Sequence, residues 1–423
     1  MRTASASPLV TTVTTDELTQ TELSDWIALF SQPSTVSNPF LHPVWVQSWY
    51  RVFTRPDQRL ILMVRRPDNG RLIGVVPLHR QVLRVSGIPM ARRLVPVGAG
   101  TAPTAFEIPG FLAAPGMARD VARTSVTTLF EQRDVDWSEL TIALEQGWFE
   151  PEWAFAGGDR PVAFGEHQRA RACVVLPLLP TWEATRGRLK RNLKESIRRS
   201  YNRMARWPAT ATVIHRTAAE LDQSAISRFL ELHRRRSLTQ HASITHPDAY
   251  ADEQNRALLR TALPTLARAG LASIYELSMD GQVTASQLAL HAGTTSYVHS
   301  SGFDPSVWAL GPVTMLQTEL VKSAIGRGDS VINFSPGPSV SKLRWSESLW
   351  VANDFAFASG SRRLAVRYGA FQAMSSLRRS ASSIAFVRRQ SVPRDSARAT
   401  VGTPVRGARP TGEGTSPEVG RSA

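Results

Sequence analysis

"SYVHSSGFDPSVWALGPVTMLQTELVKSAIGRGDSVINFSPG", residues 296–337, decides the fold of the second half of the chain. The stretch begins with a strand pattern, which is followed by a glycine-containing turn. Pro312 then begins a predicted helix, which ends at Gly326 or Gly328, and a second strand follows. A helix N-terminus after such a turn presents unpaired N–H groups and the positive end of the helix dipole, which can bind a pyrophosphate. The residues whose backbone would do so are Ala309, Leu310, Gly311 and Val313.

The residues around this stretch continue the pattern. Asp280-Gly281 and Ala292-Gly293 mark tight turns, so residues 272–303 are predicted to form three strands. Helical spacing covers residues 181–206, 218–237 and 249–270, the last interrupted or kinked at Pro264. Further strands are predicted at residues 171–178 and 349–359.

The first half of the chain also mixes helices and strands. Helical spacing covers residues 15–32 and the residues after Pro43. Asp68-Asn69-Gly70 predicts a hairpin within residues 59–83. Short strands are predicted in residues 92–100, 105–113 and 137–145, with a helix over residues 118–133. This half is therefore predicted to be α+β, ending near residues 157–170.

Composition excludes several classes of protein. The chain has 423 residues, 42% of them hydrophobic, which suffices for two ordinary domains. The single cysteine, Cys173, excludes an intramolecular disulfide and a multi-cysteine metal site, and core packing is its expected role. No apolar run approaches the roughly 20 residues that span a bilayer, and the first residues lack a signal-peptide pattern. We therefore expect a cytoplasmic protein.

The positive charge lies in two segments. Residues 186–206 carry nine Lys or Arg and one acid, and residues 361–423 carry twelve Arg and three acids. The net positive charge of these two segments together exceeds the net charge of the whole chain, +15, so the remaining residues are slightly acidic. Residues 361–389 have the spacing of a basic amphipathic helix, and residues 390–423 have the composition of a disordered tail.

Motifs for several other chemistries are absent from the sequence. There is no Walker loop, dinucleotide-binding glycine motif, nucleophile elbow or H-E-x-x-H motif. The histidines lack paired metal-ligand spacing, so no metal is expected.

Taken in order, these pieces resemble the GNAT (Gcn5-related N-acetyltransferase) fold, in the FemAB-like branch that includes bacterial CelD-type acyltransferases. The run "INFSPGPSVSKLRW", residues 332–345, resembles the family's pattern of aspartate, aromatic, glycine turn, tyrosine and lysine. The resemblance covers roughly residues 20–358. It implies tandem GNAT-like domains with mixed sheets flanked by helices, at residues 12–165 and 170–360. The chain departs from the pattern at Asn333, which cannot abstract a proton as an aspartate could, and at Ser341.

The resemblance implies direct attack of an amine on an acyl thioester, with acetyl-CoA or another acyl-CoA as co-substrate. The backbone near Val298 to Ser300 would polarise the thioester carbonyl. His299 is the first candidate base because its ordinary pKa lies near neutral pH. Tyr297, expected on the opposite face of the strand from His299, could donate a proton. Asp304 and Glu276 are lesser catalytic candidates.

Several other residues are candidates for binding. Lys342 and Arg344 are expected to contact phosphates of the donor or an anionic group of the acceptor, although a solvated pair of surface cations explains them equally well. Arg236, in the triplet Arg234–Arg236, could clamp an acidic substrate. The expected substrate-binding residues are Asn333, Ser335, Trp345 and Arg236.

Three functions remain open from the sequence. The first is an N-acyltransferase acting on a small-molecule, peptide or carrier-linked amine. The second is a FemAB-like transferase that uses aminoacyl-tRNA and contacts RNA through residues 186–206. The third is a non-catalytic module that binds an anionic membrane or a partner through residues 361–389. No stable partner can be inferred from the sequence.

Overall fold

The computed structural model describes most of the chain up to residue 373. The described residues are 9–15, 17–32, 38–85, 87–99, 107–132, 134–143, 162–208, 210–238, 247–359 and 366–373. Two compact units divide at Tyr368, and the following paragraphs concern the unit that ends there. Residues 366–373 are helical, whereas the rest of the helix expected over residues 361–389 and the tail expected at residues 390–423 lie outside the described residues.

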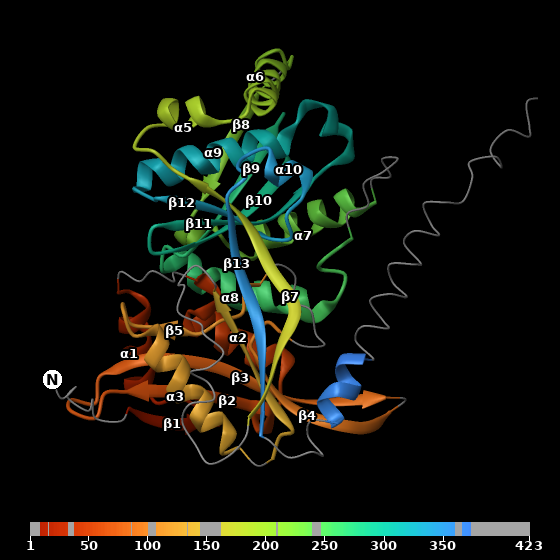
Figure 1. Ribbon diagram of the computed structural model, residues 1–423. Coiled ribbons are helices and arrows are strands. Elements are labelled where there is room, and N and C mark those ends of the chain that lie inside the picture. The colour runs from red at the N-terminus through yellow and green to blue at the C-terminus, as the bar shows by residue number, and fades with distance from the viewer. Residues whose placement is uncertain are drawn as a thin grey trace, which may run out of the picture. The chain divides into compact units, whose positions relative to one another are not determined.

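The first half begins with two helices between two strands (Figure 1). Its elements are β1 (Val10–Thr14), α1 (Gln20–Phe30), η1 (Pro39–Leu41), α2 (Pro43–Phe53), η2 (Pro56–Gln58), β2 (Arg59–Arg65), β3 (Leu72–Val85), β4 (Ile88–Pro96), β5 (Leu112–Ala113), α3 (Ala118–Phe130) and β6 (Trp137–Ala143).

The second half follows the same plan after a long strand and a basic helix pair. Its elements are β7 (Val162–Pro177), α5 (Trp182–Arg188), α6 (Arg191–Ala205), β8 (Ala211–Arg216), η4 (Ala218–Glu220), α7 (Gln223–Ser237), α8 (Glu253–Arg268), β9 (Ala272–Met279), β10 (Gln282–Ala292), β11 (Thr295–Phe303), η5 (Pro305–Leu310), α9 (Pro312–Arg327), β12 (Val331–Pro336), α10 (Val340–Leu343) and β13 (Leu349–Ser359).

The two halves repeat one order of elements. The run β1, α1, α2, β2, β3, β4, α3, β6 corresponds to β8, α7, α8, β9, β10, β11, α9, β12. In each run three antiparallel strands precede a helix, and the next strand is parallel to the last of the three. The tandem α+β organisation expected from the sequence is therefore confirmed.

One sheet connects the two halves. Its order is β1-β2-β3-β4-β6-β13-β7-β12-β11-β10-β9-β8, with β5 paired to β3 off this path. β13 and β7 lie between the halves, because β13 pairs with β6 of the first half and β7 pairs with β12 of the second. The predicted boundary between residues 165 and 170 falls inside β7, whose pairing with β13 is continuous there apart from one irregularity.

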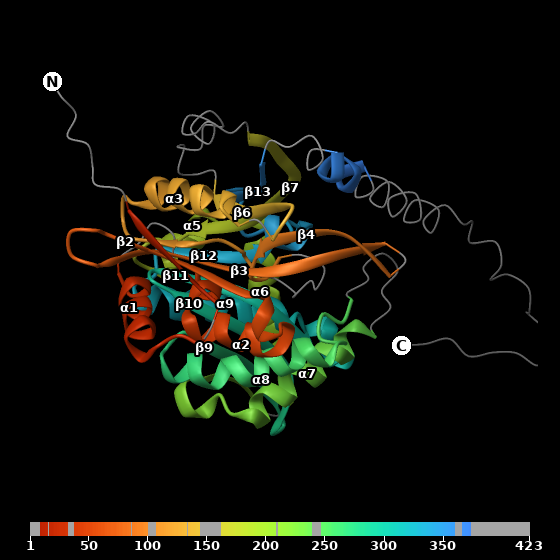
Figure 2. The ribbon, with the colours of Figure 1, turned by 90° about the horizontal axis from the view of Figure 1, so that it is seen from below.

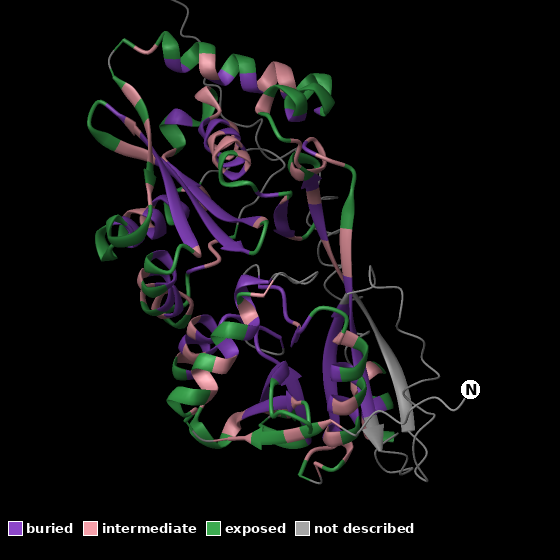
Figure 3. Cartoon of the chain, turned by 90° about the vertical axis from the view of Figure 1, so that its left-hand side faces the viewer, coloured by how far each residue is buried: buried purple, intermediate pink, exposed green. Residues whose placement is uncertain are grey.

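Helices cover both faces of this sheet. Figure 2 shows α1, α2, α7 and α8 on one side and α3 on the other. One hydrophobic core joins the first half to α7 and α8, and a second core lies under α6 and α9. Figure 3 shows that the buried residues follow the central strands, whereas the outer helix faces are exposed.

Local sequence signals account for several of these elements. The β2–β3 hairpin turns at Gly70, whose φ of 66° suits glycine, as Asp68-Asn69-Gly70 predicted. α1 begins with a capping box between Thr19 and Glu22. Pro312 is the first residue of α9, and Gly328 ends that helix with a φ of 86°, as expected.

Two helix predictions need correction. The basic helix expected over residues 181–206 is two helices, because the backbone of Leu189 is extended and its buried side chain enters the second core. Of the two outcomes predicted at Pro264, an interruption or a kink, the interruption is wrong, because α8 continues through this residue. Proline cannot donate to the carbonyl four residues earlier, and here the Arg260 carbonyl accepts a hydrogen bond from Gln223 Nε2 of α7 at 2.9 Å instead.

Two strands were not predicted. β1 and β8 lie at opposite ends of the sheet, each paired with one neighbour. Their side chains alternate weakly between exposed and half-buried, because an outer strand packs against the core less than a central strand. The strand conformation of β1 and β8 therefore depends more on their pairing with β2 and β9 than on their own sequence pattern.

Candidate functional site

The parallel strands β11 and β12 separate part-way along their length. They pair through three residues, the last pair being Tyr297 with Asn333, while β11 continues to Phe303 and β12 to Pro336. Ser335 lies where they separate, with a φ of 62°, and its Oγ donates to the Val298 carbonyl at 2.7 Å. The backbone of β11 beyond Tyr297 is thus not paired with β12.

A β-bulge occurs at the same point of β11. On β10, Leu288 is opposite Ser300 and Ala289 is opposite Val298, so His299 is an extra residue. Bulges change the direction of nearby side chains and increase the local twist. Val298 and Ser300, expected to flank the donor carbonyl, therefore lie on either side of the bulge.

His299 belongs to a buried cluster of hydroxyls. Tyr250 Oη lies 2.7 Å from Ser300 Oγ and 3.3 Å from His299 Nδ1, which itself lies 3.1 Å from Ser300 Oγ. Burial lowers the pKa of His299 to about 3, with a smaller contribution from His233, so its imidazole is neutral at neutral pH. A neutral imidazole with so low a pKa is a weak proton acceptor.

A carboxylate from the first half lies near this cluster. Glu107 is buried, and its negative charge adds to the effect of burial in raising the pKa of Tyr250. The carboxylate packs against Gly98, where an added Cβ would meet Glu107 Oε2 at 2.3 Å. The charge of an acid from the first half thus acts on a hydroxyl cluster of the second.

The end of α7 packs directly on β11. Arg236 Nη1 donates to the carbonyl and hydroxyl oxygens of Ser301, at 2.9 and 2.8 Å, and its guanidinium lies 5.7 Å from the Phe303 ring centroid. Burial lowers the pKa of Arg236 to about 10. Gly302 permits this approach, since an added Cβ would lie 2.3 Å from the His233 backbone nitrogen. Arg236 is thus beside the bulge, held by β11.

Two of the lesser catalytic candidates have other partners. Glu276 is on β9, fully buried, and pairs with Arg216 and with Arg228. Asp304 accepts the Ser306 backbone N–H at 2.9 Å and pairs with Arg235, so it caps η5. The structure does not bring Glu276 to the divergence of β11 and β12.

The expected relation between Tyr297 and His299 was wrong. Both rings lie beside Phe40, with centroids 6.3 and 5.9 Å from the Phe40 ring. Successive side chains of a strand alternate, so residues two apart share a face. Tyr297 and His299 therefore face the first half together.

The N-terminus of α9 has the predicted form, with α6 packed against it. Gly311 adopts a left-handed conformation, with a φ of 72°, and no side chain caps the helix. Ser200 Oγ donates to the Gly311 carbonyl at 3.3 Å, and Arg203 Nη1 donates to the Ala309 carbonyl. Leu310 and Val313 are half-buried. The turn that leads into α9 thus contacts one basic side chain of α6, Arg203.

The residues after β12 mostly hold the loop together. Lys342 Nζ donates to the carbonyls of Ser335 and Pro336, at 3.1 and 2.9 Å, and burial lowers its pKa to about 8. Arg344 donates to the Asn192 carbonyl and to Ser196 of α6.

Two predicted substrate-binding residues are buried in the fold. Asn333 Oδ1 accepts the Ser335 backbone N–H at 2.8 Å, and Trp345 packs on Phe334 with ring centroids 5.5 Å apart. Both side chains are about 5% exposed or less, so they shape the loop rather than meet solvent.

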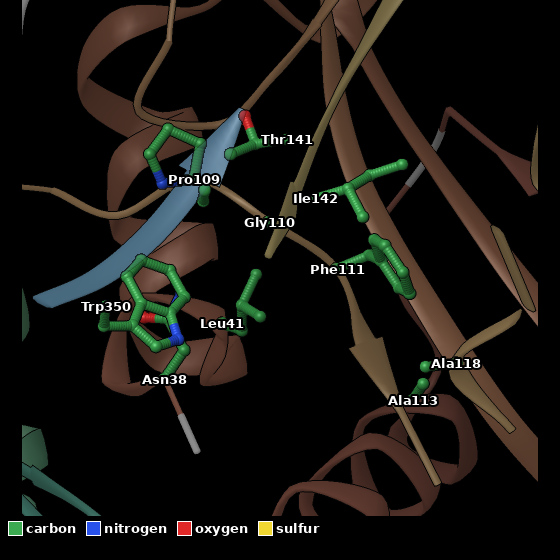
Figure 4. A pocket seen from close by; sticks show the side chains of 11 residues that line it. Asn38, Leu41, Pro109, Gly110, Phe111, Ala113, Ala118, Thr141, Ile142 and Trp350 are labelled. Carbon is green, nitrogen blue, oxygen red and sulfur yellow. The ribbon is translucent and has the colours of Figure 1, made fainter. Parts of the chain in front are cut away.

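The corresponding corner of the first half contains a small apolar pocket. β4 and β6 pair as far as Leu94 with Ser138, and the pocket lies beyond, at the end of β6 and the start of α3. Its walls enclose about 420 Å³, part of it open to solvent. Figure 4 shows the lining residues: Asn38, Leu41, Pro109, Gly110, Phe111, Ala113, Ala118, Thr141, Ile142, Trp350 and Ala352.

Sequence reasoning missed Tyr250 and Glu107. Tyr250 lies 49 residues before His299 in the sequence, in a segment with no motif. Glu107 lies within the strand predicted at residues 105–113, without any catalytic spacing. Only the tertiary contacts of Tyr250 with β11, and the charge of Glu107 acting on Tyr250, reveal them, so no local signal could have found them.

Residues 191–343 match the family model described as the Acetyltransferase (GNAT) domain. This part of the chain is a GNAT domain. The match includes α6, the separated strands β11 and β12, and the intervening α9.

One of the similar solved structures, FemX, shares the fold across both halves. FemX aligns with a TM-score of 0.55 and 11% identity, covering 81% of this chain and 96% of FemX. A protein of unknown function from Bacteroides thetaiotaomicron aligns at 0.49 and 15% identity, covering 79% and 97%. A tandem GNAT protein of clavulanic acid biosynthesis aligns at 0.40 and 11%, covering 84% and 99%. The sequence matched no curated protein.

The described residues hold no cluster of three or more histidine, cysteine or acidic side chains placed to bind a metal ion. No helix among them is both long enough and apolar enough to cross a bilayer.

Proposed function

We propose that this GNAT protein is an N-acyltransferase that moves an acetyl or longer acyl group from a CoA or carrier-protein thioester to an amine. The observation that carries the proposal is the divergence of β11 and β12 beside the uncapped N-terminus of α9, inside the GNAT match. A cytoplasmic location and the tandem domain boundaries are part of the same proposal.

The donor occupies the place where β11 loses its parallel neighbour. Its phosphates lie at the start of α9, where the helix dipole and the first-turn N–H groups favour an anion. Arg203 on α6 is exposed and adds positive charge at this corner. The thioester carbonyl lies against the backbone of Val298 to Ser300, which stabilises negative charge on the carbonyl oxygen.

The amine attacks from the side of the Tyr250 cluster. Attack on the thioester carbon forms a tetrahedral intermediate, and its collapse breaks the C–S bond and releases a thiolate that takes up a proton. Tyr250 stays protonated at neutral pH because burial raises its pKa, and its hydroxyl is the proposed proton donor. His299 remains the predicted base, and the Glu107 carboxylate is a second candidate because it is ionisable, buried and near Tyr250.

Donor binding tests this proposal at Gly311. The variant Gly311→Ala, made together with Ser200→Ala to remove the contact that a Cβ would make, distorts the start of α9. Gly328→Ala makes the same change at the other end of α9, where an added Cβ meets nothing within 4 Å. We expect the first variant to lose affinity for acetyl-CoA and for long-chain acyl-CoAs in calorimetric titrations, and Gly328→Ala to keep it.

No heat of binding and no thermal shift with any CoA thioester, even at millimolar concentration, would argue against the CoA form of the proposal. Release of free CoA in the presence of a panel of amines then measures the activity itself.

A second candidate function uses aminoacyl-tRNA as the donor. The observation that favours it is a row of exposed arginines on α6, next to the start of α9; its members are Arg191, Arg198, Arg199, Arg203 and Arg206. Only Arg198 among them pairs with an acid in the structure, Glu195 on the same helix. FemAB-like enzymes, which the sequence resembles, use such donors.

Salt dependence distinguishes this candidate from CoA-dependent transfer. Each RNA phosphate contacted adds about 0.7 to 0.9 to the slope of log affinity against log salt. Replacing Arg199 and Arg206 by glutamine is expected to lower that slope by about 1.5 if both contact tRNA. A chain that binds no tRNA at low salt would eliminate this candidate.

A further inference from the structure

The tip of the β3–β4 hairpin exposes several large apolar side chains. Ile88 is 63% exposed, Met90 49% and Val82 40%. Large apolar side chains normally occur singly on a protein surface, whereas contiguous groups of them mark sites of interaction. Three such side chains within one hairpin therefore require an explanation.

The corresponding hairpin of the second half turns through exposed Gly293 and Thr294 but exposes no large apolar side chain. β10 and β11 turn between Ala292 and Thr295, and Ala292 is 1% exposed. β3 has 14 residues and β10 has 11, and Figure 1 shows the β3–β4 end projecting past the neighbouring strands. The repeated topology thus does not require an apolar tip; the longer hairpin of the first half creates it.

The hairpin is also positively charged. Residues 80–93 contain four arginines and no acid. Arg80 pairs with Asp134 and Arg93 with Glu139, which neutralises the two nearest the body. Arg84 and Arg92 are exposed, and Arg84 Nη1 donates to the Gly87 carbonyl at 2.8 Å. Two exposed cations thus lie among the apolar side chains of the tip.

The last residues of the first unit, Arg367 and Tyr368, contact the base of this hairpin. Asp136 accepts the Arg92 backbone N–H at 2.8 Å and pairs with Arg367 at 2.7 Å, and the Tyr368 ring packs on Trp137. Residues 369–423, which follow, carry nine arginines and three acids.

We propose that the β3–β4 tip docks on an anionic lipid surface. Ile88, Met90 and Val82 enter the boundary between headgroups and acyl chains, while Arg84 and Arg92 contact lipid phosphates. An RNA would attract the arginines, but it would gain little from Ile88 and Met90, because bases stack on aromatic side chains. The combination of aliphatic and cationic side chains at one tip fits a lipid surface better.

A fluorescent label at the tip tests insertion directly. Cys173 is buried, so a cysteine introduced at position 88 is the accessible one among the described residues. The full-length variant Ile88→Cys carries an environment-sensitive dye and is mixed with vesicles of phosphatidylcholine, with or without phosphatidylglycerol. We expect a blue shift with anionic vesicles. The control label, Ile27→Cys on α1, has a similarly exposed position and is expected to show no shift.

Vesicle sedimentation with unlabelled full-length variants measures the contribution to affinity. The double variant Ile88→Ser, Met90→Ser is expected to lower the partition coefficient at least about tenfold. The matched control Leu238→Ser, Ile27→Ser removes side chains that are 64% and 44% exposed elsewhere, and is expected to partition like the parent.

Three results would overturn the proposal. They are no binding of the parent to anionic vesicles, an unshifted label at position 88 while the chain is vesicle-bound, and equal losses in the two double variants. The second would mean that another basic segment holds the chain on the membrane. If the parent does not bind vesicles, and the tip variant loses an RNA or protein binding that the parent has, the tip would be assigned to that partner.

Discussion

At the scale of single residues, His299 should leave a signature in the pH dependence of stability. Its pKa is about 3 in the folded chain and about 6.5 when unfolded. Between these values the unfolded chain binds a proton that the folded chain does not, so acid favours unfolding by up to about 1.4 kcal/mol per pH unit.

The variant His299→Gln lacks this titration. We expect it to be less stable than the parent at pH 7, with the difference in unfolding free energy shrinking as the pH falls from 6.5 toward 4. Urea titrations of both proteins across this pH range measure the difference. The other buried histidines contribute equally to both proteins, so their effect on the difference cancels. A difference independent of pH would contradict the lowered pKa.

The Tyr250 hydroxyl is expected to contribute to both stability and turnover. Tyr250→Phe removes the hydroxyl beside Ser300 and His299, which should cost about 1 kcal/mol of stability. If that hydroxyl donates the proton, turnover should fall about a hundredfold with little change in the KM for the thioester.

Tyr201→Phe is the control for this variant. The Tyr201 hydroxyl bonds Glu319 and accepts from Lys322, away from the bulge in β11. We expect a comparable loss of stability with unchanged turnover. Equal effects of the two variants on turnover would remove the assigned role of Tyr250.

At the scale of elements, the contact between α7 and β11 depends on Gly302. In Gly302→Ala the new Cβ would lie 2.3 Å from the His233 backbone nitrogen, so α7 must move. Overpacking of this kind should cost about 3 kcal/mol and displace Arg236, which is on the same helix. Chemical denaturation measures the cost.

Gly326→Ala gives the opposite expectation. Gly326 is inside α9, and an added Cβ meets nothing within 4 Å. Alanine should stabilise the chain by about 0.5 to 1 kcal/mol, because it restricts the unfolded state and favours the helix. A destabilised Gly326→Ala would show that the helix there is more crowded than the structure indicates.

At the scale of the whole unit, the halves should unfold together. Asp354 on β13 accepts from Thr141 of β6 at 2.6 Å and forms a two-bond ion pair with Arg171 of β7. These three strands join the halves in one sheet. Asp354→Ala leaves Arg171 without its carboxylate and should cost about 3 kcal/mol.

Scanning calorimetry tests whether that cost applies to both halves. We expect one transition for residues of both halves, shifted to lower temperature in Asp354→Ala. Asp57→Ala removes an exposed partner of Arg55 and should change little. Two transitions, only one of them shifted, would show that the halves unfold independently.

The sequence by itself determined the succession of elements. Alternation, turn glycines and Pro312 are local properties, and they correctly predicted the β2–β3 hairpin, the three strands β9 to β11, and α9. The collinear motifs pointed to tandem GNAT-like halves; the fold confirms two α+β halves with one order of elements, and the GNAT family model matches residues 191–343 of the second. The outer strands β1 and β8 were not predicted, because their alternation of exposed and buried residues is weak.

Only the tertiary structure decided which side chains meet. Tyr250 and His299 are far apart in the sequence and meet in one buried cluster, and Glu107 of the first half acts on Tyr250 through its charge, because folding brings these segments together. Both Glu276 and Trp345 were candidate site residues. In the structure Glu276 forms ion pairs on its strand, and Trp345 packs in the core. Periodicity reports whether a residue faces a core, but contacts between distant segments depend on how elements pack, and one sequence carries no local signal for that.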